Sequence, residues 1–303
     1  MTLQQGFNLV GNPFPRAAYI DKPYYTLNEN GSAVPTTSAK STATAISPCY
    51  GVVVQGTSNN ETLTFTTTAP VASGSTNQGH LQIALNQATE PVDPSLRGTK
   101  QSSTIDNAIV SFNEGEQLGK FYFGSQNANI YLPQDGKEYA IAYSDKQGEM
   151  PFNFKAMKNG TYTISVNPEG VEMSYLHLID NMTGADVDLL ATNGGDARPC
   201  VSTYTFTAKT TDYASRFSLV FACGDDNGNN GGDNDNFAFF SNGNLIVNGT
   251  GTLQVIDILG REVAQKELST FNSQLSTLNY APGIYVLRLI NSNDVKTQKV
   301  VIE

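Results

Sequence analysis

The apolar residues of this chain come in short alternating runs, each followed by Gly, Pro, Asn or a polar turn. Runs such as LQIALN at 81–86, EYAIAYS at 138–144 and GTYTISVN at 160–167 repeat at every second position. That period matches a strand with one buried face, whereas a helix needs apolar residues three and four positions apart. Turn sequences such as QDGK at 134–137 separate the runs. We therefore predict an all-β protein of consecutive β-sandwich domains, of jelly-roll or immunoglobulin-like type.

One stretch, GDDNGNNGGDNDN at 224–236, has no apolar side chain at all. A run of Gly, Asn and Asp cannot bury enough surface to offset its ordering entropy, so we interpret it as a flexible linker that protease cuts first. A calcium loop of the EF-hand type is the alternative. In that loop Gly231 would fall one position late, and Asn236 at position twelve lacks the bidentate carboxylate.

The linker divides the chain into a long body and a C-terminal unit. We predict a β-sandwich over residues 1–148, a small immunoglobulin-like domain over 149–223, and an immunoglobulin-like domain over 237–303 after the linker at 224–236. A chain of 303 residues is long enough for two or three such cores.

Charge and composition limit the partners and the cellular setting. The formal net charge is −10, which argues against nucleic acid and against an anionic membrane surface. Only 15% of the residues are charged, a composition typical of many extracellular β proteins. No apolar run is long enough for a transmembrane helix, and MTLQQGFNLV lacks the pattern of a signal peptide. Either the protein stays inside the cell, or this sequence is a piece of a longer protein. The strand-like pattern of Phe7, Leu9 and Val10 at the very start favours a piece, so we expect the C-terminal portion of a longer protein.

Three cysteines stand at positions 49, 200 and 223, without a CxxC pair, so we expect no zinc site. If 200–208 and 215–223 formed a hairpin, Cys200 and Cys223 would face each other on one side of it. A disulfide between them is geometrically possible, and two reduced core cysteines are the alternative. Cys49 would then be left over.

No residue pattern in the chain indicates catalysis. The two histidines, His80 and His177, lie at a loop edge and in a strand, and Glu114 and Glu116 are interpreted as part of a solvated loop. The GxSxG, HExxH, GxGxxG and P-loop patterns are absent. We therefore predict that the chain is not an enzyme and has no catalytic residue, cofactor or metal site.

Sugar binding is harder to exclude, because the chain has 14 tyrosines. Tyr24, Tyr25 and Tyr50 could line an exposed patch on which a sugar stacks. The absence of Trp argues against this, and tyrosines that simply pack at sandwich edges are the other interpretation.

Three short motifs stand out in the C-terminal unit, in GTLQVIDILGREV, in LNYAPGIYVLRLI and in the closing KTQKVVIE. Their order, spacing and position at the chain end resemble the C-terminal sorting domain of the type IX secretion system of Bacteroidetes. The residues that fall on the family's motifs are Asp257, Gly260, Arg261, Pro282, Gly283, Ile284, Tyr285, Lys299, Val300, Val301 and Ile302.

Elementary geometry predicts local structure for the same motifs. Gly260 lies after a strand at a tight turn that needs a permissive backbone, and Pro282-Gly283 suits the central positions of a type II turn. The period of two puts Tyr285 on one face of its strand and Ile284 on the other.

Two segments of the body resemble parts of large Bacteroidetes surface proteins. GFNLVGNPFP at 6–15 resembles a segment common in those proteins, with Phe7 in place of the usual Trp. LIDNMTGADVDLL at 178–190, followed by YTFTAKTTDYASRFSLVF at 204–221, resembles a module that often precedes the sorting domain.

Together these resemblances imply a secreted, non-catalytic, adhesin-like protein displayed at the outer-membrane surface. The implied partners are the type IX translocon and the surface-attachment machinery, with cleavage in or near the linker. A host glycan or protein is a further candidate partner. The alternative function is a carbohydrate- or matrix-binding module accessory to a secreted enzyme.

Overall fold

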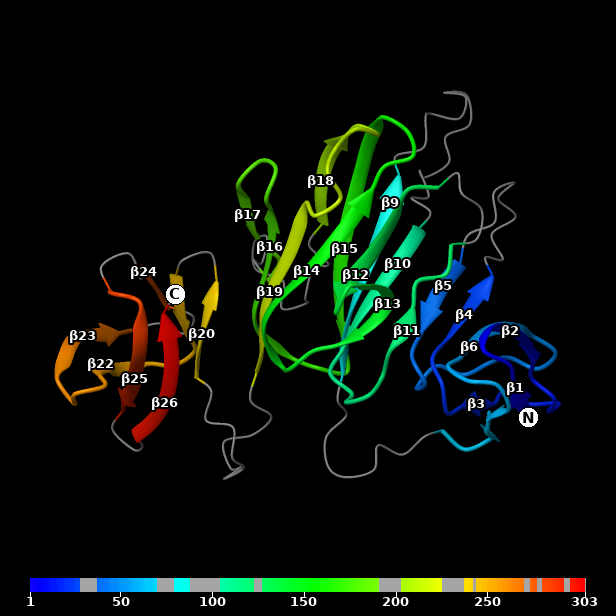
Figure 1. Cartoon of the computed structure of the whole chain (residues 1–303), viewed down its shortest axis with the longest axis horizontal. Helices are drawn as coiled ribbons and strands as arrows, with labels where there is room; N and C mark the ends of the chain where they lie inside the picture. Colours follow the sequence, from blue (N-terminus) through cyan, green and yellow to red (C-terminus); the bar gives the residue numbers. More distant parts are fainter. Residues whose placement is uncertain are drawn as a thin grey trace, which may run out of the picture. The chain divides into compact units, whose positions relative to one another are not determined.

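The regular structure of the chain is entirely β in the residues that the structure describes. This computed structural model describes residues 1–27, 37–69, 79–87, 104–122, 127–190, 203–224, 237–241, 244–269, 273–276, 280–291 and 295–302. They contain 26 strands and no helix, so within these ranges no helix could span a membrane (Figure 1). The all-β prediction is confirmed. Beyond Gly224, the predicted linker with its alternative calcium loop lies outside the described residues.

The chain divides into two compact units by its backbone contacts. The first comprises Met1–Asp145, Met150–Val171 and His177–Leu219. The second comprises Lys146–Glu149, Glu172–Leu176 and Val220–Glu303.

The first unit begins with short strands in three small sheets, β2-β6-β4-β5, β1-β7 and β3-β8. Their bounds are β1 (Thr2–Leu3), β2 (Gly6–Gly11), β3 (Tyr19–Ile20), β4 (Tyr24–Leu27), β5 (Thr37–Lys40), β6 (Gly51–Gly56), β7 (Glu61–Thr62) and β8 (Phe65–Thr66). These sheets share a core of buried side chains that includes Leu3, Val10, Tyr24 and Val54.

Asn12 organises the turn that follows β2, within the GFNLVGNPFP segment. The residue is buried, and its side-chain amide donates to the carbonyl oxygens of Arg16 at 2.9 Å and Ile46 at 2.9 Å. Its Oδ1 accepts from the backbone N–H of Phe14 at 2.9 Å. One short side chain thus satisfies several backbone groups of a loop that has no strand partner, which explains why the segment needs an Asn here.

The remaining strands of the body form one 11-stranded sheet (Figure 1). The order is β17-β16-β19-β14-β12-β13-β10-β9-β15-β18, with β11 paired to β13. The bounds are β9 (His80–Gln87), β10 (Thr104–Ser111), β11 (Leu118–Gly119), β12 (Asn129–Gln134), β13 (Lys137–Tyr143), β14 (Gln147–Lys155), β15 (Gly160–Glu169), β16 (Met173–Asp180), β17 (Ala185–Asp188), β18 (Thr203–Ala208) and β19 (Phe217–Cys223). The predicted QDGK turn joins β12 to β13, and Asp135 and Gly136 have the positive φ, 51° and 71°, of a type I′ hairpin.

This sheet folds back on itself around an aromatic core. Phe154 of β14 lies 5.1 Å from Phe206 of β18, between ring centroids, and Phe206 lies 4.9 Å from Phe217 of β19. In the strand order, however, β14 and β19 stand far from β18. Rings so far apart along the sheet meet only if its two halves face each other, as the layers of a sandwich do.

The sheet also runs across position 148, where two domains were predicted to meet. β9, from the range 1–148, pairs along its full length with β15, from the range 149–223, with Ile83 opposite Val166. β12 likewise pairs with β14, with Ile130 opposite Phe154. Residues 1–148 and 149–223 therefore do not form separate sandwiches, because their strands share one hydrogen-bonded sheet.

The predicted hairpin between 200–208 and 215–223 is wrong. β18 pairs with β15, and the neighbours of β19 are β14 and β16. Phe206 and Phe217 do touch, but across the two layers rather than along a hairpin. Cys200 lies outside the described residues, so its bridge to Cys223 stays a prediction without the hairpin register behind it.

The second unit contains two further sheets, β20-β21-β24 and β23-β22-β25-β26 (Figure 1, yellow to red). Their strands are β20 (Ala238–Ser241), β21 (Asn244–Val247), β22 (Gly251–Asp257), β23 (Glu262–Leu268), β24 (Ser273–Ser276), β25 (Gly283–Ile290) and β26 (Val295–Ile302). Buried side chains from both sheets form one core, among them Val247, Leu253, Leu287 and Val300.

Gln298 ties β26, the last strand of the chain, to β20. Its side-chain Oε1 accepts from the backbone N–H of Ala238 at 2.7 Å, and its Nε2 donates to the carbonyl oxygen of Ala238 at 2.6 Å. The side-chain amide thereby replaces the backbone partner that β20 would otherwise need at this position. Removing β26 would break this link as well as the core.

Candidate functional site

The three C-terminal motifs come together at one end of the sheet β23-β22-β25-β26. Asp257 at the end of β22 pairs with Tyr285 of β25, and Tyr285 pairs with Val300 of β26. In the next pairs outward, Ile284 lies opposite Val301, and Gly283 lies opposite Ile302. Segments that are widely spaced in the chain therefore build one continuous edge of a folded surface.

Asp257 holds the turn between β22 and β23. Its Oδ1 accepts from the backbone N–H of Leu259 at 2.9 Å and of Arg261 at 3.0 Å. Its Oδ2 accepts from Nε of Arg261 at 2.8 Å, and Nη2 of Arg261 lies 2.7 Å away. The backbone N–H of Arg261, together with its guanidinium, lowers the pKa of Asp257, so the carboxylate stays ionised at neutral pH.

Gly260 supplies the left-handed residue of this turn, with a φ of 78°. A left-handed conformation is costly for residues with a Cβ, so the predicted need for a permissive backbone is confirmed. The backbone N–H of Gly260 also donates to the carbonyl oxygen of Asp257 at 2.9 Å. The turn is thus specified locally by its Asp, Gly and Arg.

The tip of this turn carries two apolar side chains in solvent. Ile258 is 75% exposed and Leu259 is 74% exposed. Neither residue is among those that fall on the family's motifs, although two consecutive large apolar side chains inside a turn are themselves an unusual signal. Asp257 holds this turn in one conformation, and the tip presents apolar side chains to solvent. These are the features of a surface that contacts another protein.

The neighbouring strands continue the apolar surface. Ile284 and Val301, which lie opposite each other, are 42% and 54% exposed, and Lys299 beside them is exposed. Tyr285 and Val300 point to the core instead, so the alternation predicted for these strands is confirmed. The motif residues therefore separate into a set that builds the core and a set that remains available at the surface.

The predicted type II turn at Pro282-Gly283 is not present. Such a turn requires a positive φ at its third residue. Gly283 is not among the glycines with positive φ, and it is already the first residue of β25. The hydroxyl of Tyr285 donates to the carbonyl oxygen of Ala281 at 2.8 Å, which steadies the entry to the strand instead.

The residues that were considered for catalysis have structural partners. Nδ1 of His177 lies 2.6 Å from Oδ1 of Asp186 on the paired strand β17, and His80 opens β9 beside Glu169. Glu116 is buried rather than solvated. Its carboxylate accepts hydrogen bonds from the hydroxyl of Ser111 at 2.6 Å and from the backbone N–H of Thr42 at 2.9 Å. These contacts stabilise loops and strand pairs.

Two of the three tyrosines that were considered for sugar binding are buried. Tyr24 and Tyr25 are each 1% exposed, and their hydroxyls donate to the carbonyl oxygens of Thr44 and Gly119. Of the three only Tyr50 is substantially exposed, so they do not line a common exposed patch, and Tyr24 and Tyr25 pack in the interior instead. In the described part of the chain, no group of three or more His, Cys, Asp and Glu side chains could hold a metal ion.

Comparison with known proteins identifies the C-terminal unit. Residues 234–303 match the family model of the secretion system C-terminal sorting domain. Neither a curated protein nor a solved structure matches the chain. A domain of this kind is the signal for type IX secretion, so the chain is a secreted protein whose sorting domain interacts with the type IX machinery.

Proposed function

We propose that this chain is the C-terminal portion of a non-catalytic, adhesin-like protein of a Bacteroidetes bacterium, displayed on the outer surface of the cell. The match of residues 234–303 to the sorting domain carries the proposal. The β-rich body supports it, because sandwich folds are common among cell-surface proteins. The resemblance of 6–15 and 178–221 to segments of large surface proteins points in the same direction.

The sorting step is recognition of the folded end of the sheet by the translocon. Ile258, Leu259, Ile284 and Val301 supply exposed apolar groups, and Lys299 adds a positive charge beside them. Burial of apolar side chains gives affinity, and the charge favours a partner with a complementary acidic group. Cleavage in or near 224–236 then releases the body for attachment to the surface.

Deletion of the last eight residues, KTQKVVIE, tests this function in a type IX-competent host. The deletion removes nearly all of β26, including the buried Val300 and Ile302 and the Gln298 link. It also leaves the edge of β25 unpaired. We expect the protein to accumulate in the periplasm. Antibody labelling of intact cells at the level of the unaltered chain would contradict the export role.

A carbohydrate- or matrix-binding module accessory to a secreted enzyme is the second candidate function. An exposed aromatic ring beside a cavity in the first unit favours it, since Tyr122 is 51% exposed. The two candidates share the export step and differ in what precedes this sequence in the full-length protein. Sequencing the gene upstream of Met1 separates them, because an adjoining catalytic domain would support the accessory module.

A further inference from the structure

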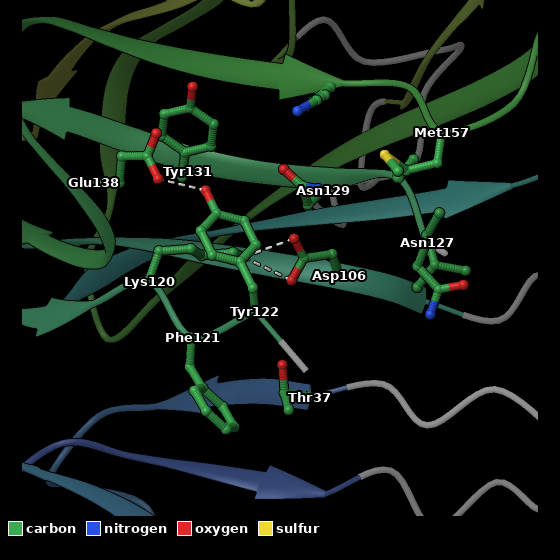
Figure 2. Close-up of a pocket in the computed structure, with 13 residues that line it drawn as sticks. Thr37, Asp106, Lys120, Phe121, Tyr122, Asn127, Asn129, Tyr131, Glu138 and Met157 are labelled. Atoms are coloured by element: carbon green, nitrogen blue, oxygen red, sulfur yellow. Dashed lines mark hydrogen bonds and ion pairs between the residues drawn. The ribbon is translucent and has the colours of Figure 1, made fainter. Parts of the chain in front are cut away.

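A cavity of about 370 Å³ opens in the first unit (Figure 2). Its walls come from segments that are distant in the chain: Thr37 of β5, Asp106 of β10, the segment at 120–122, β12 with β13, and residues beyond the end of β14. A volume of this size lies within the usual range for small-ligand pockets. None of the motifs recognised in the sequence contributes to it.

A closed ion pair lies at the base of the cavity. Nζ of Lys120 donates to Oδ1 of Asp106 at 2.8 Å and to Oδ2 at 2.6 Å, and the two side chains are only 2% and 9% exposed. The backbone N–H of Ile130 also donates to Oδ2, at 2.8 Å. Because the ammonium group and the carboxylate neutralise each other, the pair makes the base of the cavity rigid and adds no net charge to it.

Tyr122 forms one wall and is held in place by Glu138. Its hydroxyl donates to Oε2 of Glu138 at 2.6 Å, although the side chain is half exposed (Figure 2). Burial, and next the hydrogen bond to Glu138, raise the pKa of Tyr122, so the phenol stays neutral and keeps donating at physiological pH. An exposed aromatic ring whose tilt is restrained by a hydrogen bond is a preorganised stacking face.

Polar groups face this ring from the neighbouring strands. Asn129 of β12 lines the cavity, and its Oδ1 has no hydrogen-bond partner in the described structure (Figure 2). Lys155, which pairs with Asn129 in the sheet, lines it as well. With Asp106, Lys120 and Glu138, the lining contains two acidic and two basic side chains, so it has no net formal charge.

We propose that this cavity binds a neutral saccharide, with one face of the sugar ring stacked on Tyr122 and hydroxyl groups bonded to Glu138 and Asn129. A sugar ring has an apolar CH face and hydroxyls that both donate and accept, which matches an aromatic wall beside a carboxylate and an amide. A purely apolar ligand would leave these polar groups desolvated and unpaired, and the balanced lining offers no net attraction to an anion or a cation. This site deepens the proposed function, because it names a class of ligand for the body of the protein. It rests on the proposed function only for the location, the cell surface, at which the protein would meet the sugar.

A glycan array with the purified full-length chain tests the site apart from export. The array carries neutral oligosaccharides of glucose, galactose, mannose and xylose, together with sialylated and sulfated glycans. We expect binding to neutral members, and calorimetry with the best one gives its Kd. Tyr122→Ala should weaken binding at least about tenfold, whereas Tyr122→Phe, which keeps the ring but frees Glu138, should weaken it less.

Two exposed tyrosines elsewhere in the first unit provide matched controls. Tyr50 is 47% exposed and Tyr213 is 48% exposed, and neither lines the cavity. Tyr50→Ala and Tyr213→Ala should leave the Kd unchanged, and circular dichroism checks that each variant is folded. The site is overturned if no neutral glycan binds, if only charged glycans bind, or if folded Tyr122→Ala binds as tightly as the unaltered chain. Surface display in cells is measured in a separate experiment, so a failure of sugar binding can be distinguished from a failure of export.

Discussion

The guanidinium of Arg216 and the carboxylate of Asp180 form a two-pronged ion pair inside the first unit, with Nε 2.9 Å from Oδ1 and Nη2 2.8 Å from Oδ2. The side chains are 2% and 0% exposed. The hydroxyl of Tyr204 donates to Oδ2 at 2.9 Å, and the backbone N–H of Met182 donates to Oδ1 at 3.0 Å. The guanidinium also lies over the ring of Phe206, 4.6 Å from its centroid. A buried pair that is hydrogen-bonded so completely is stable only while both partners remain.

Arg216→Met should therefore lower the free energy of unfolding by about 3–5 kcal/mol, because it leaves the carboxylate of Asp180 buried without its cation. Urea denaturation followed by circular dichroism measures the change. Replacing both residues, as Asp180→Leu with Arg216→Met, should recover part of the loss. Glu61→Gln removes the partner of Lys22 in a more exposed pair and should have a much smaller effect. Equal losses for Arg216→Met and Glu61→Gln would refute the assigned role.

The same pair predicts a pH dependence. Burial alone would raise the pKa of Asp180, but hydrogen bonds from Arg216, Tyr204 and Met182 outweigh burial and lower it. The folded pKa is thus below the unfolded value of about 3.9, so the contribution to stability is present above that value and is lost as pH falls through the folded pKa. Urea titrations between about pH 5 and about pH 2 should show a smaller acid loss for Asp180→Asn than for the unaltered chain. Glu114→Gln, a control at an exposed carboxylate, should lose as much stability in acid as the unaltered chain does.

Two glycines of the sorting motifs should respond differently to alanine. Gly260 has a φ of 78° with open space around it, so Gly260→Ala introduces backbone strain of about 1–3 kcal/mol and no clash. At Gly283, which lacks a positive φ, the new Cβ would lie 3.9 Å from the ring of Tyr285, an ordinary contact. We expect faster hydrogen exchange of the amides of β22 and β23 in Gly260→Ala and little change in Gly283→Ala. The same exchange in both variants would show that the turn does not depend on Gly260.

Lys299→Glu tests whether recognition of the sorting domain is partly electrostatic. Lys299 is exposed on β26 opposite Val286, so the strand should keep its fold while the surface charge reverses. We expect surface display to fall while the thermal transition is preserved. Thr297→Glu places a carboxylate two positions away on the same exposed face and should reduce display less. If the two variants display equally, the charge at position 299 has no specific role.

The bridge between Cys200 and Cys223 stays a prediction, and a count of reactive thiols tests it. If Cys200 and Cys223 are bridged, denatured, non-reduced protein should have one reactive thiol, at Cys49, which is exposed in the structure. Thiol labelling with peptide mapping identifies the site, and Cys49→Ser should abolish the signal. Three reactive thiols would rule the bridge out.

Local structure in this protein follows from the sequence, because it depends on neighbouring residues. The two-residue alternation predicted strands throughout the chain, and Asp135-Gly136 forms the hairpin expected of its turn type. The Asp257 turn could be anticipated for the same reason, since its Asp, Gly and Arg act on one another within five consecutive positions. The sorting motifs could be recognised at all because they are short and local.

Strand partners and the body's cavity were decided only by the tertiary structure. Alternation shows that Phe206 and Phe217 are buried, but it does not distinguish a hairpin partner from a residue in the opposite layer of a folded sheet. The sequence predicts a domain boundary at position 148 because local patterns do not reveal the pairing of β9 with β15, whose paired residues lie about 80 positions apart. The cavity beside Tyr122 is hidden from the sequence for the same reason: Thr37 of β5 and Asp106 of β10 join its lining from distant parts of the chain, and no local pattern marks such a meeting. The sequence by itself thus determined the strands, the turns at Asp135-Gly136 and Asp257, and the sorting signal, whereas long-range hydrogen bonding and burial decided which of them share a core and a site.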